Sequence, residues 1–586
     1  MVANGSDILI DTLHAFGVDT IFGMPGDGIN GIMEAIRTRP DRIRFIQVRH
    51  EEAAAFAATA HAKLTGRLGC CLATTGPGGV HLLNGLYDAK LDRAPVIAIT
   101  FFNDTATTEI YTQQDIDHSK VFMDVAEYTT RVMGARHMAN VATLACRHAL
   151  GYRGVAHLSV PVDVQEEPVP HDQASDRNVK GHASLVPADG ERFAPDAEIA
   201  RAAALLNASE RVAILAGAGA AGAVDELTRA ADLLGAPIGK ALMGKGLLPD
   251  DHPFTTGGIG LLGTRPTQEA MEGCDTLLIV GSTFPYIEYY PKPGQARGVQ
   301  IDRDPTRIGL RFPAEVGLVG DARTTLTKLN ALLQRKTDRA FLEQAQAASR
   351  DWRALLRDAA NRDAMPMHPG RIVQEVGDRL ADDAVVIWDS GHNTGLMARY
   401  VVAKSRQTYQ GSGLSASMAC SLPYATAAAL AHPGRQVVAF VGDGGLSMLM
   451  GELATIARYR LPVKIVVIKN GRLGQIRWEQ MMFLGNVEYE CDLQPIDFAA
   501  VAEACGIRSW RVDAPGDAAR VADEALAYAG PVLIEATVDA DEPLLPPKRR
   551  EKYATNMDKA LAEGTADADS VREHLAREPA RTMLEA

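Results

Sequence analysis

The chain of 586 residues contains 46% hydrophobic and 23% charged residues, with 53 glycines and 30 prolines. This composition is typical of a globular α/β protein, and the length predicts about three or four domains. The formal net charge of −13 argues against a nucleic-acid partner and against general binding to anionic membranes.

The first residues, MVANGSDILIDTLHAFGV, lack the basic segment and apolar core of a signal peptide. No apolar run approaches the length that spans a bilayer. The seven cysteines are scattered and have no zinc-ligand spacing, which favours a reducing compartment without a structural metal–thiolate site. We therefore expect a cytoplasmic protein.

Three stretches of the chain repeat one pattern, in which short apolar runs precede glycine-rich turns and helical periods. Unbroken apolar strands that alternate with helices indicate parallel sheets covered on both faces. We predict an α/β fold of three doubly wound parallel-sheet domains, at residues 1–165, 190–335 and 365–545. The clearest predicted strands are RFIQV, GCCLATT, PVIAIT, VAHLSVP, RVAILAGAG, TLLIVGS, GVQID, AVVIWDSG, QVVAFVGDGG, VKIVVIKNG and PVLIEATV.

Polar segments rich in proline or charge separate these domains and end the chain. Residues 166–190 and 336–364 are predicted linkers. Residues 546–586 form a charged tail, in which Pro579 and several acids make a membrane-inserting amphipathic helix a poor interpretation. We expect this tail to be packed or partly disordered.

The first domain contains the segment QVRHEEAAAFAATAHAKLTG, where an apolar strand gives way to an alanine-rich helix. Its acids, Glu51 and Glu52, lie in the predicted first helical turn. Carboxylates at that position are favoured by the helix dipole and by unpaired N–H groups, so the pattern alone requires no function. The resemblance described below is what distinguishes the two acids.

Residues 103–112 read NDTATTEIYT. They match the direct translation of AATGATACGGCGACCACCGAGATCTACAC, a common sequencing adapter. We hypothesise that this segment is an assembly artefact, and we assign no functional residue to it. Resequencing of the source locus tests the hypothesis, which fails if the locus contains these codons.

The second domain contains a formal dinucleotide fingerprint. Gly217, Gly219 and Gly222 follow the strand RVAIL with the spacing G-x-G-x-x-G, which alone is a weak signal. The next predicted strand does not end in the acid that would bind a ribose. The sequence therefore argues against an NAD dehydrogenase.

The third domain contains the most specific motif, VVAFVGDGGLSMLMGELATIARYRLPVKIVVIKNG. One strand ends at Asp443 within Gly-Asp-Gly-Gly, and the next strand ends at Asn470. Neighbouring parallel strands bring such residues together at the carboxyl edge of a sheet. Their oxygens suit Mg²⁺, and the glycines and following helix suit a diphosphate. A glycine-rich turn with a capping aspartate is the alternative.

These motifs resemble the thiamine diphosphate (ThDP) enzymes, and in particular the pyruvate oxidases and pyruvate:quinone dehydrogenases. The likeness extends to about residue 545. It rests on the Gly-Asp-Gly motif followed by Asn470, and on GPGGVHLLNGLYDAKLDRAPVIAI, GSTFPYIEYYP and IDRDPTRIG. The resemblance implies a pyrimidine-binding first domain, an FAD-type middle domain and a diphosphate-binding third domain.

The resemblance assigns roles to individual residues. Glu51 is the implied catalytic carboxylate that contacts the cofactor's pyrimidine, and Glu52 is a helix-start or pairing residue. Mg²⁺ would be held by Asp443, Asn470 and the carbonyl of Arg472. Met418 would wedge the cofactor into its bent shape, with core packing as the alternative role. The other implied residues of the thiamine site are Gly26, Thr75, Gly76, Gln114, Ser390, Gly391, Ser417, Gly444 and Gly445.

The same resemblance implies FAD in the middle domain, with an empty relict site as the alternative. The implied FAD residues are Gly219, Gly260, Leu261, Gly281, Thr283, Phe284 and Asp302. Glu479 is implied near the substrate, although an exposed helix acid would also explain it. Gln475 replaces an aromatic residue that in relatives lies between thiamine and flavin, which puts electron transfer in doubt and spares decarboxylation.

The resemblance therefore implies oxidative decarboxylation of pyruvate or a close 2-oxo acid. Electrons would pass to FAD and then to oxygen or quinone, and acetate or acetyl phosphate would be formed. An acetolactate synthase-like carboligase or a simple decarboxylase is the alternative. A homodimer or homotetramer is implied, because relatives build each site from two subunits. A non-catalytic nucleotide-binding or assembly protein is disfavoured, because the activating acid and the metal motif are both intact.

Overall fold

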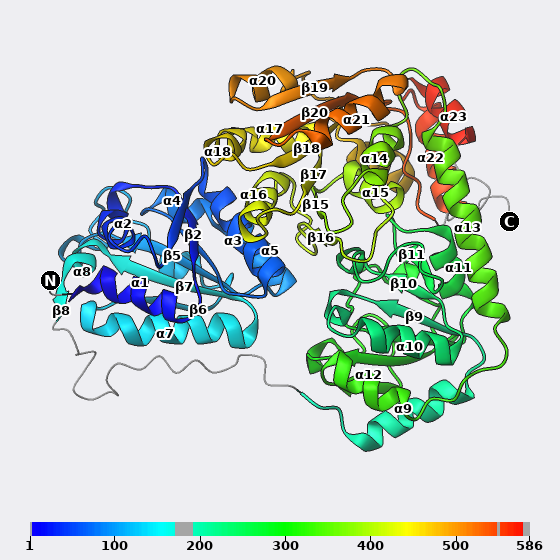
Figure 1. Cartoon of the computed structure of the whole chain (residues 1–586), viewed down its shortest axis with the longest axis horizontal. Coiled ribbons are helices and arrows are strands. Elements are labelled where there is room, and N and C mark those ends of the chain that lie inside the picture. Colours follow the sequence, from blue (N-terminus) through cyan, green and yellow to red (C-terminus); the bar gives the residue numbers. More distant parts are fainter. Residues whose placement is uncertain (1–2, 170–191, 548–550, 566, 578–586) are drawn as a thin grey trace.

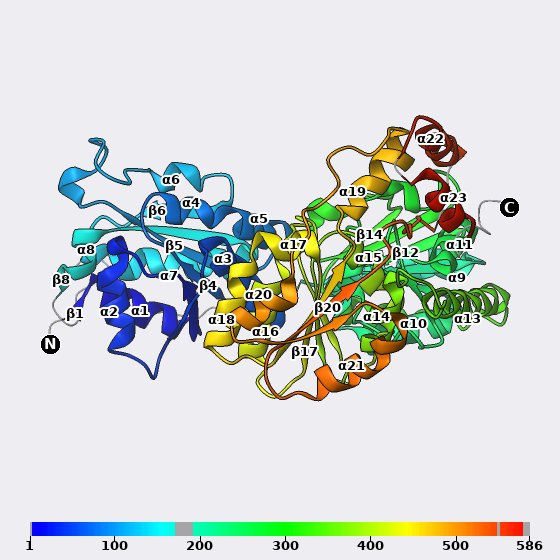
Figure 2. The ribbon, with the colours of Figure 1, turned by 90° about the horizontal axis from the view of Figure 1, so that it is seen from above.

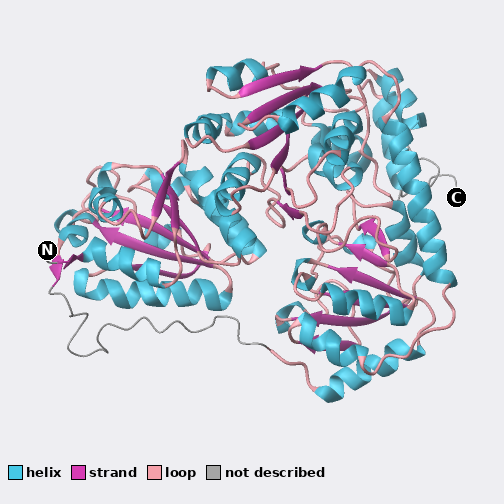
Figure 3. Cartoon of the chain, in the orientation of Figure 1, coloured by secondary structure: helices cyan, strands magenta, loops and turns pink. Residues whose placement is uncertain are grey.

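The computed structural model describes residues 3–169, 192–547, 551–565 and 567–577. It contains three parallel sheets of six strands, each covered by helices on both faces (Figures 1 and 3). The predicted α/β class with three doubly wound domains is confirmed. Most of the expected linker at 166–190 lies outside the described residues.

The first domain lies to one side of the other two in both overall views, and its helices α3 and α5 face them (Figures 1 and 2). Its sheet has the order β3-β2-β4-β5-β7-β6. The strands are β2 (Thr20–Gly23), β3 (Arg44–Gln47), β4 (Gly69–Leu72), β5 (Val96–Phe102), β6 (Ala126–Arg131) and β7 (Val155–Pro161), and β1 (Ala3–Asn4) pairs with β8 (Pro168–Val169). The helices are α1 (Gly5–Ala15), α2 (Asn30–Arg37), α3 (Glu51–Thr65), α4 (Pro77–His81), α5 (Leu83–Asp92), α6 (His118–Val121), α7 (Ala135–Tyr152) and α8 (Val162–Glu166).

The second domain has a sheet of order β11-β10-β9-β12-β13-β14. Its strands are β9 (Val212–Ala216), β10 (Ile238–Lys240), β11 (Thr255–Gly258), β12 (Thr276–Val280), β13 (Arg297–Asp302) and β14 (Val316–Val319). The helices are α9 (Asp196–Ala208), α10 (Val224–Leu234), α11 (Arg265–Gly273) and α12 (Ala322–Asn330). This strand order is the one typical of dinucleotide-binding domains.

The third domain has a sheet of order β16-β15-β17-β18-β20-β19. Its strands are β15 (Val385–Trp388), β16 (Thr408–Gln410), β17 (Val437–Gly442), β18 (Val463–Lys469), β19 (Arg508–Val512) and β20 (Val532–Thr537). The helices are α14 (Pro369–Asp378), α15 (His392–Tyr400), α16 (Ser421–Ala431), α17 (Asp443–Met448), α18 (Leu453–Arg458), α19 (Gly474–Glu479), α20 (Phe498–Ala504) and α21 (Ala518–Ala527). Counted along the chain, the first and third sheets have the same strand order.

The alanine-rich helix α3 joins the first and third domains. Its residues from Ala53 to Ala62 are all buried, because the helix packs on its own sheet on one side and on α16 on the other. A helix enclosed in this way is apolar all round, and small side chains let its neighbours approach closely. One continuous core therefore runs from β3 to β17 and fixes the first domain against the third.

Two segments outside the sheets are helical. The expected linker at 336–364 is mostly the helix α13 (Ala340–Ala360), which buries Leu342, Trp352 and Leu356. The charged tail contains α22 (Glu551–Ala562) and α23 (Ala568–Arg577), and Met557 and Val571 join the core of the third domain. The tail is therefore packed over these ranges.

In the described part of the chain, no helix is long and apolar enough to cross a membrane. All seven cysteines are free, and six of them are buried.

Candidate active site

Glu51 lies at the start of α3, directly after the N-cap residue His50. Glu51 is 9% exposed, and its Oε2 lies 3.0 Å from Nδ1 of His81. The ring of His81 stacks on that of His50, with centroids 4.5 Å apart. The neighbouring Glu52 instead accepts a hydrogen bond from Asn84 at 2.6 Å. The two acids therefore have different partners: Glu51 is bonded to the ring of His81, whereas Glu52 is bonded to Asn84 and lies 3.9 Å from Nδ1 of His50.

The other expected residues of the first domain lie in loops at the carboxyl ends of the strands, where Gly78 at the start of α4 approaches Glu51. The hydroxyl of Thr75 donates to Oε1 of Gln114 at 2.8 Å. Gly76 lies against the side chain of Gln114, and Gly26 lies against Thr74. The loops after β2 and β4 meet where the strand order reverses, which is the usual binding position of such sheets.

Residues 103–112 form an exposed loop that leads to Gln114. Ile110 and Tyr111 are 61% and 100% exposed, and Thr105 donates to Asp163 across the surface. The core of the first domain therefore does not depend on these side chains.

Asp443 and Asn470 are brought together by adjacent strands, as the sequence predicts. β17 and β18 pair in parallel, so their ends meet at one sheet edge. Oδ2 of Asp443 accepts the N–H of Gly471 at 2.7 Å, and Oδ1 of Asn470 accepts the N–H of Arg472 at 3.0 Å. Asp443 is 6% exposed, and burial raises the pKa of its carboxyl to about 6.

These donors fit a magnesium ion. A carboxylate, an amide oxygen and a nearby carbonyl are hard oxygen ligands, and Mg²⁺ keeps further positions for phosphate oxygens. A desolvated carboxylate is stabilised by a divalent cation, which would reverse the rise in the pKa of Asp443.

Asp389 is a supporting residue that the sequence analysis missed. It is fully buried after β15, and it accepts the N–H groups of Ser390, Ala419 and Ser421 at 2.9 to 3.0 Å. Burial raises the pKa of its carboxyl to about 6. These bonds tie the end of β15 to the segment before α16. The sequence signal was an Asp-Ser-Gly turn after an apolar strand.

Gly445 faces this carboxylate. A Cβ at Gly445 would lie only 2.4 Å from Oδ1 of Asp389. Because Asp389 is held by three backbone groups, it cannot move aside cheaply. Only a glycine therefore fits at this position. It lets the turn after β17 pack closely against Asp389, which precedes Ser390 and Gly391.

Met418 lies in the segment that Asp389 holds. It lines the cavity described below, and its methyl group lies 3.4 Å from the position of a Cβ on Gly444. Its neighbours Ala416 and Ala419 have φ angles of 49° and 70°. Non-glycine residues in the left-handed region store strain that packing must offset. The backbone is thus bent to present Met418 to the cavity.

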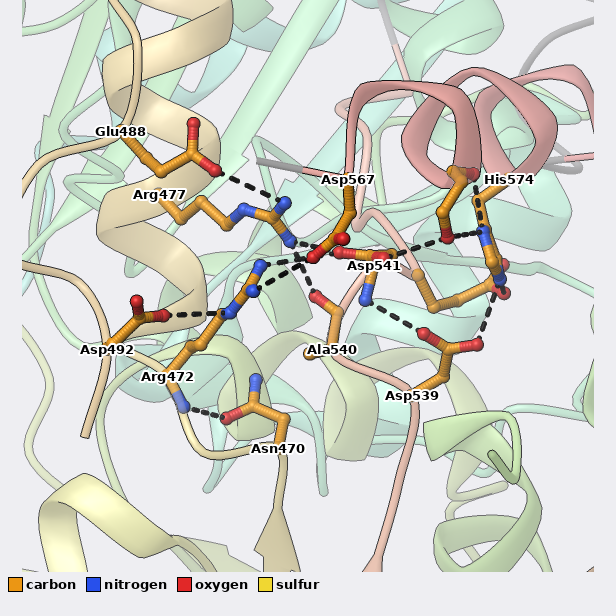
Figure 4. Close-up of polar contacts among 12 residues, drawn as sticks. Asn470, Arg472, Arg477, Glu488, Asp492, Asp539, Ala540, Asp541, Asp567 and His574 are labelled. Atoms are coloured by element: carbon orange, nitrogen blue, oxygen red, sulfur yellow. Dashed lines mark hydrogen bonds and ion pairs between the residues drawn. The ribbon is translucent and has the colours of Figure 1, made fainter. Parts of the chain in front are cut away.

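The C-terminal helices cover the loop that carries Asn470 and Arg472 (Figure 4). The guanidinium of Arg472 contacts Asp492, Asp541 and Asp567 at 3.0 to 3.4 Å. The wholly buried Arg477 pairs with the same Asp541 at 2.5 Å. The tail therefore helps to fix the backbone beside the candidate metal site.

His574 anchors α23 in the same region. Its Nε2 lies 2.9 Å from Asp539 and 3.9 Å from Glu542. The bond to Asp539 raises the pKa of His574 to about 9. The imidazolium form is therefore favoured in the docked tail.

One cavity of about 580 Å³ extends from the second domain to the third. Its wall includes these sequence-predicted residues: Ser390, Gly391, Met418, Asp443, Gly444, Gly445, Asn470, Arg472, Glu479, Leu261, Gly281, Thr283 and Phe284. Nine other expected residues lie in the described part of the chain but do not line the cavity: Gly26, Glu51, Thr75, Gly76, Gln114, Ser417, Gly219, Gly260 and Asp302. Within one chain, the residues around Glu51 and those around Asp443 therefore do not share a cavity.

The second-domain part of the cavity lies where the strand order reverses between β9 and β12. Gly219 and Gly281 touch back to back there, since a Cβ on Gly281 would lie 2.5 Å from Gly219. Gly281 has a φ of 56°, which a side chain rarely adopts. Gly260 packs beneath the ring of Phe284. Open α/β sheets bind nucleotides at this point.

The first domain also reaches this cavity, which sequence reasoning missed. Leu91, Asp92 and Arg93 at the end of α5 line it. The guanidinium of Arg93 pairs with Asp304 of the second domain at 2.7 Å. Asp302 lies beside Asp304 outside the cavity, and burial raises the pKa of its carboxyl.

Gln475 and Glu479 lie on α19 at the cavity wall. The amide of Gln475 donates to Oε1 of Glu479 at 3.0 Å, one helical turn away. Both side chains are partly exposed to the cavity. Glu479 is therefore oriented by its neighbour at the cavity wall.

Three parallel sheets with glycine-rich turns at the reversal points, and a magnesium-type donor pair at the carboxyl edge of the third sheet, are typical of cofactor-dependent α/β enzymes. Three family models match the chain, each described as thiamine pyrophosphate enzyme: the N-terminal TPP binding domain at residues 3–121, the central domain at 199–329 and the C-terminal TPP binding domain at 389–536. The chain therefore belongs to the thiamine pyrophosphate enzyme family.

Whole-length relatives include enzymes of two activities. YdaP of Bacillus subtilis (strain 168), described as thiamine pyrophosphate-containing, is 39% identical over 92% of each chain. Pyruvate oxidase of Lactiplantibacillus plantarum is 34% identical over 94% of this chain and 90% of the relative. Acetolactate synthase 2 of Zea mays is 30% identical over 92% and 86%.

Proposed function

We propose that this protein is a ThDP- and Mg²⁺-dependent enzyme that decarboxylates pyruvate, or a close 2-oxo acid, and passes electrons to bound FAD. The observation that carries this proposal is the single cavity. It opens at the reversal point of a sheet with dinucleotide-type strand order and continues to Asp443 and Asn470. A flavin and a thiamine cofactor bound there would share one cavity, which would keep them close together for electron transfer.

The third domain supplies the groups that would hold the thiamine diphosphate. Asp443, Asn470 and the carbonyl of Arg472 would bind the metal, and the N–H groups at the start of α17 would contact phosphate oxygens. Ser390, Gly391 and Gly445 leave room for the diphosphate beside the backbone. When bound, the thiazolium supplies an electron sink for the carbon atom that loses CO₂.

Glu51 would hold a proton at the aminopyrimidine of the cofactor. Because the residues around Glu51 and Asp443 do not share a cavity in one chain, we propose that each complete site contains Glu51 of one copy and Asp443 of another. Thr75 and Gln114 would stand beside that Glu51. Met418 would support the bend that brings the two rings of the cofactor together.

Residues of the second domain would hold the flavin. Gly281, Thr283 and Phe284 line the cavity, and Arg307 donates to the hydroxyl of Thr283 at 3.0 Å. Arg93 from the first domain lies at the same wall. The turn at Gly281 and the ring of Phe284 suit a dinucleotide, and the cations Arg93 and Arg307 suit its charged pyrophosphate.

An acetolactate synthase-like carboligase, or a non-oxidative decarboxylase, is the second candidate. It is favoured by Gln475, which places an amide where relatives with oxidase activity carry an aromatic ring. The amide is bonded to Glu479, so α19 presents a polar pair to the cavity. Decarboxylation needs no aromatic residue at this position. Carboligation likewise needs none, because its further requirement is a second 2-oxo acid.

An anaerobic absorbance spectrum of the purified protein, with Mg²⁺ and ThDP, separates these functions. The proposed function predicts a flavin band that bleaches after pyruvate is added, at the rate of CO₂ release. An unchanged band, or no band, with CO₂ still released would instead support the carboligase or decarboxylase. Admission of oxygen or a quinone to the reduced protein then identifies the acceptor.

A further inference from the structure

Glu452 is an acidic side chain buried at the contact between the first and third domains. It ends the short 3-10 turn η7 (Met450–Glu452), which follows α17, and it is 2% exposed. Its Oε1 accepts the N–H groups of Arg49 at 2.8 Å and His50 at 3.1 Å. Its other oxygen accepts the hydroxyl of Thr455 at 2.6 Å. Both carboxylate oxygens are therefore engaged.

The two N–H groups that Glu452 accepts directly precede the helix that carries Glu51. In a capping box, a Glu or Gln at the third helical position reaches back to the N–H of the N-cap residue. The N-cap of α3 is His50, and its third helical position is Ala53, whose methyl side chain cannot accept a hydrogen bond. Glu452 of the third domain instead accepts the N–H of the N-cap residue His50.

The surrounding contacts fix the same stretch of backbone. The N–H of Gln47 donates to the hydroxyl of Tyr459 at 2.8 Å, and Arg458 contacts the side chain of Gln47. Both partners lie on or directly after α18, which follows η7. Residues 47–50, which connect β3 to α3, are thus held by residues 452–459 of the third domain.

We propose that Glu452 is a positioning residue for Glu51. It fixes the N–H of His50, and through it the first turn of α3, so that the carboxylate of Glu51 meets the cofactor's pyrimidine in one orientation. This inference rests on the proposed role of Glu51 in thiamine activation. It does not depend on whether the enzyme is an oxidase or a carboligase.

Two substitutions at Glu452 separate its hydrogen bonds from its charge. In Glu452→Gln, the amide oxygen can still accept both N–H groups, and the amide nitrogen can donate to Thr455. In Glu452→Ala, both N–H groups lose their acceptor. Tyr459→Phe is the matched control, because it removes one hydrogen bond from the same segment at Gln47 and leaves the cap of α3 intact.

The first readout uses the protein without cofactor. Backbone hydrogen–deuterium exchange of residues 47–53 should be faster by about tenfold at Arg49 and His50 in Glu452→Ala. It should stay near the wild-type rate at these two residues in Glu452→Gln and Tyr459→Phe. Equal protection in all four proteins would overturn the inference.

The second readout is proton exchange at C2 of bound ThDP, measured by NMR without substrate. Glu452→Ala should slow this exchange by about tenfold, and Glu452→Gln should restore it to within about threefold of wild type. An unchanged rate in Glu452→Ala, or an equal loss in both variants, would contradict the proposed role. If Glu51→Gln itself left the rate unchanged, the proposed role of Glu51 would fail instead.

Discussion

The first and third domains have the same strand order and carry different chemistry at the same place. In the third sheet, the strand ends at the reversal point carry Asp443, Gly445 and the buried Asp389. In the first sheet, the corresponding loops carry Thr75 and Gly76, with Glu51 close by. One sheet therefore offers metal and phosphate ligands, and the other offers a carboxylate with hydrogen-bonding side chains.

One architecture therefore provides two half-sites. Under the proposed function, each half-site would bind a chemically different end of the cofactor, and neither would be complete alone. Because the two half-sites of one chain do not share a cavity, we propose that the working enzyme contains at least two copies of the chain.

Glu51→Gln should have the largest effect, because it removes the proposed proton-holding group of the first half-site. We expect turnover to fall by at least about 100-fold while cofactor binding changes little. Steady-state kinetics and calorimetric titration with ThDP measure the two quantities. Glu52→Gln is the matched control and should keep most activity, since Glu52 is bonded to Asn84 instead. Near-normal turnover in Glu51→Gln would contradict the assignment.

Asp443→Ala tests the other half-site. It removes the charged ligand of the candidate metal site, so ThDP affinity at a fixed Mg²⁺ concentration should fall by more than about tenfold. Calorimetric titration of ThDP in the presence of Mg²⁺ measures this loss, and removal of Mg²⁺ from the wild type should reproduce it. FAD content serves as the control and should not change. Unaltered ThDP affinity would exclude Asp443 from the metal site.

Gly445→Ala tests the close packing of the third sheet. The new methyl group would lie 2.4 Å from Asp389 Oδ1, and overpacking of this kind costs about 1–3 kcal/mol of stability. Denaturant unfolding measures the loss. Gly516→Ala is the control, because a Cβ there meets no atom within 4 Å. Equal stability of the two variants would show that the turn can relax.

The pH dependence of the tail should be the smallest effect. The pKa of His574 is raised from 6.5 to about 9 by Asp539, so its contribution is complete below pH 6.5 and is lost as the pH rises through 9. We expect hydrogen exchange of α23 to increase between pH 7 and 10, beyond the intrinsic rise. His574→Gln should remove this extra dependence. A pH-independent α23 in the wild type would contradict the assignment.

The sequence predicted the fold class because the central strands are unbroken apolar runs. All eleven quoted segments contain strands of the structure. The strands that were not quoted are short or polar, such as β6 and β19 at sheet edges, where one side needs no apolar cover. The helix α13 was mistaken for a linker because charged residues mask its buried stripe, which recurs at Leu342, Ala345, Ser349, Trp352 and Leu356.

The sequence also placed the metal-type pair correctly, because adjacent parallel strands leave little freedom to Asp443 and Asn470. For Asp389 it offered only an Asp-Ser-Gly turn after an apolar strand, and it could not reveal Arg93 or Glu452. Each of these acts through contacts between segments far apart in the chain, and no local pattern records such contacts. Glu452 is an example, since its partners lie in the first domain.

The most direct measurement mixes two inactive proteins. Glu51→Gln and Asp443→Ala chains are unfolded together, refolded and assayed for 2-oxo acid decarboxylation. If each site takes Glu51 from one copy and Asp443 from another, every mixed dimer contains one intact site, and about a quarter of wild-type activity returns. No activity above that of the separate variants, with mixed dimers present, would contradict a site shared between copies.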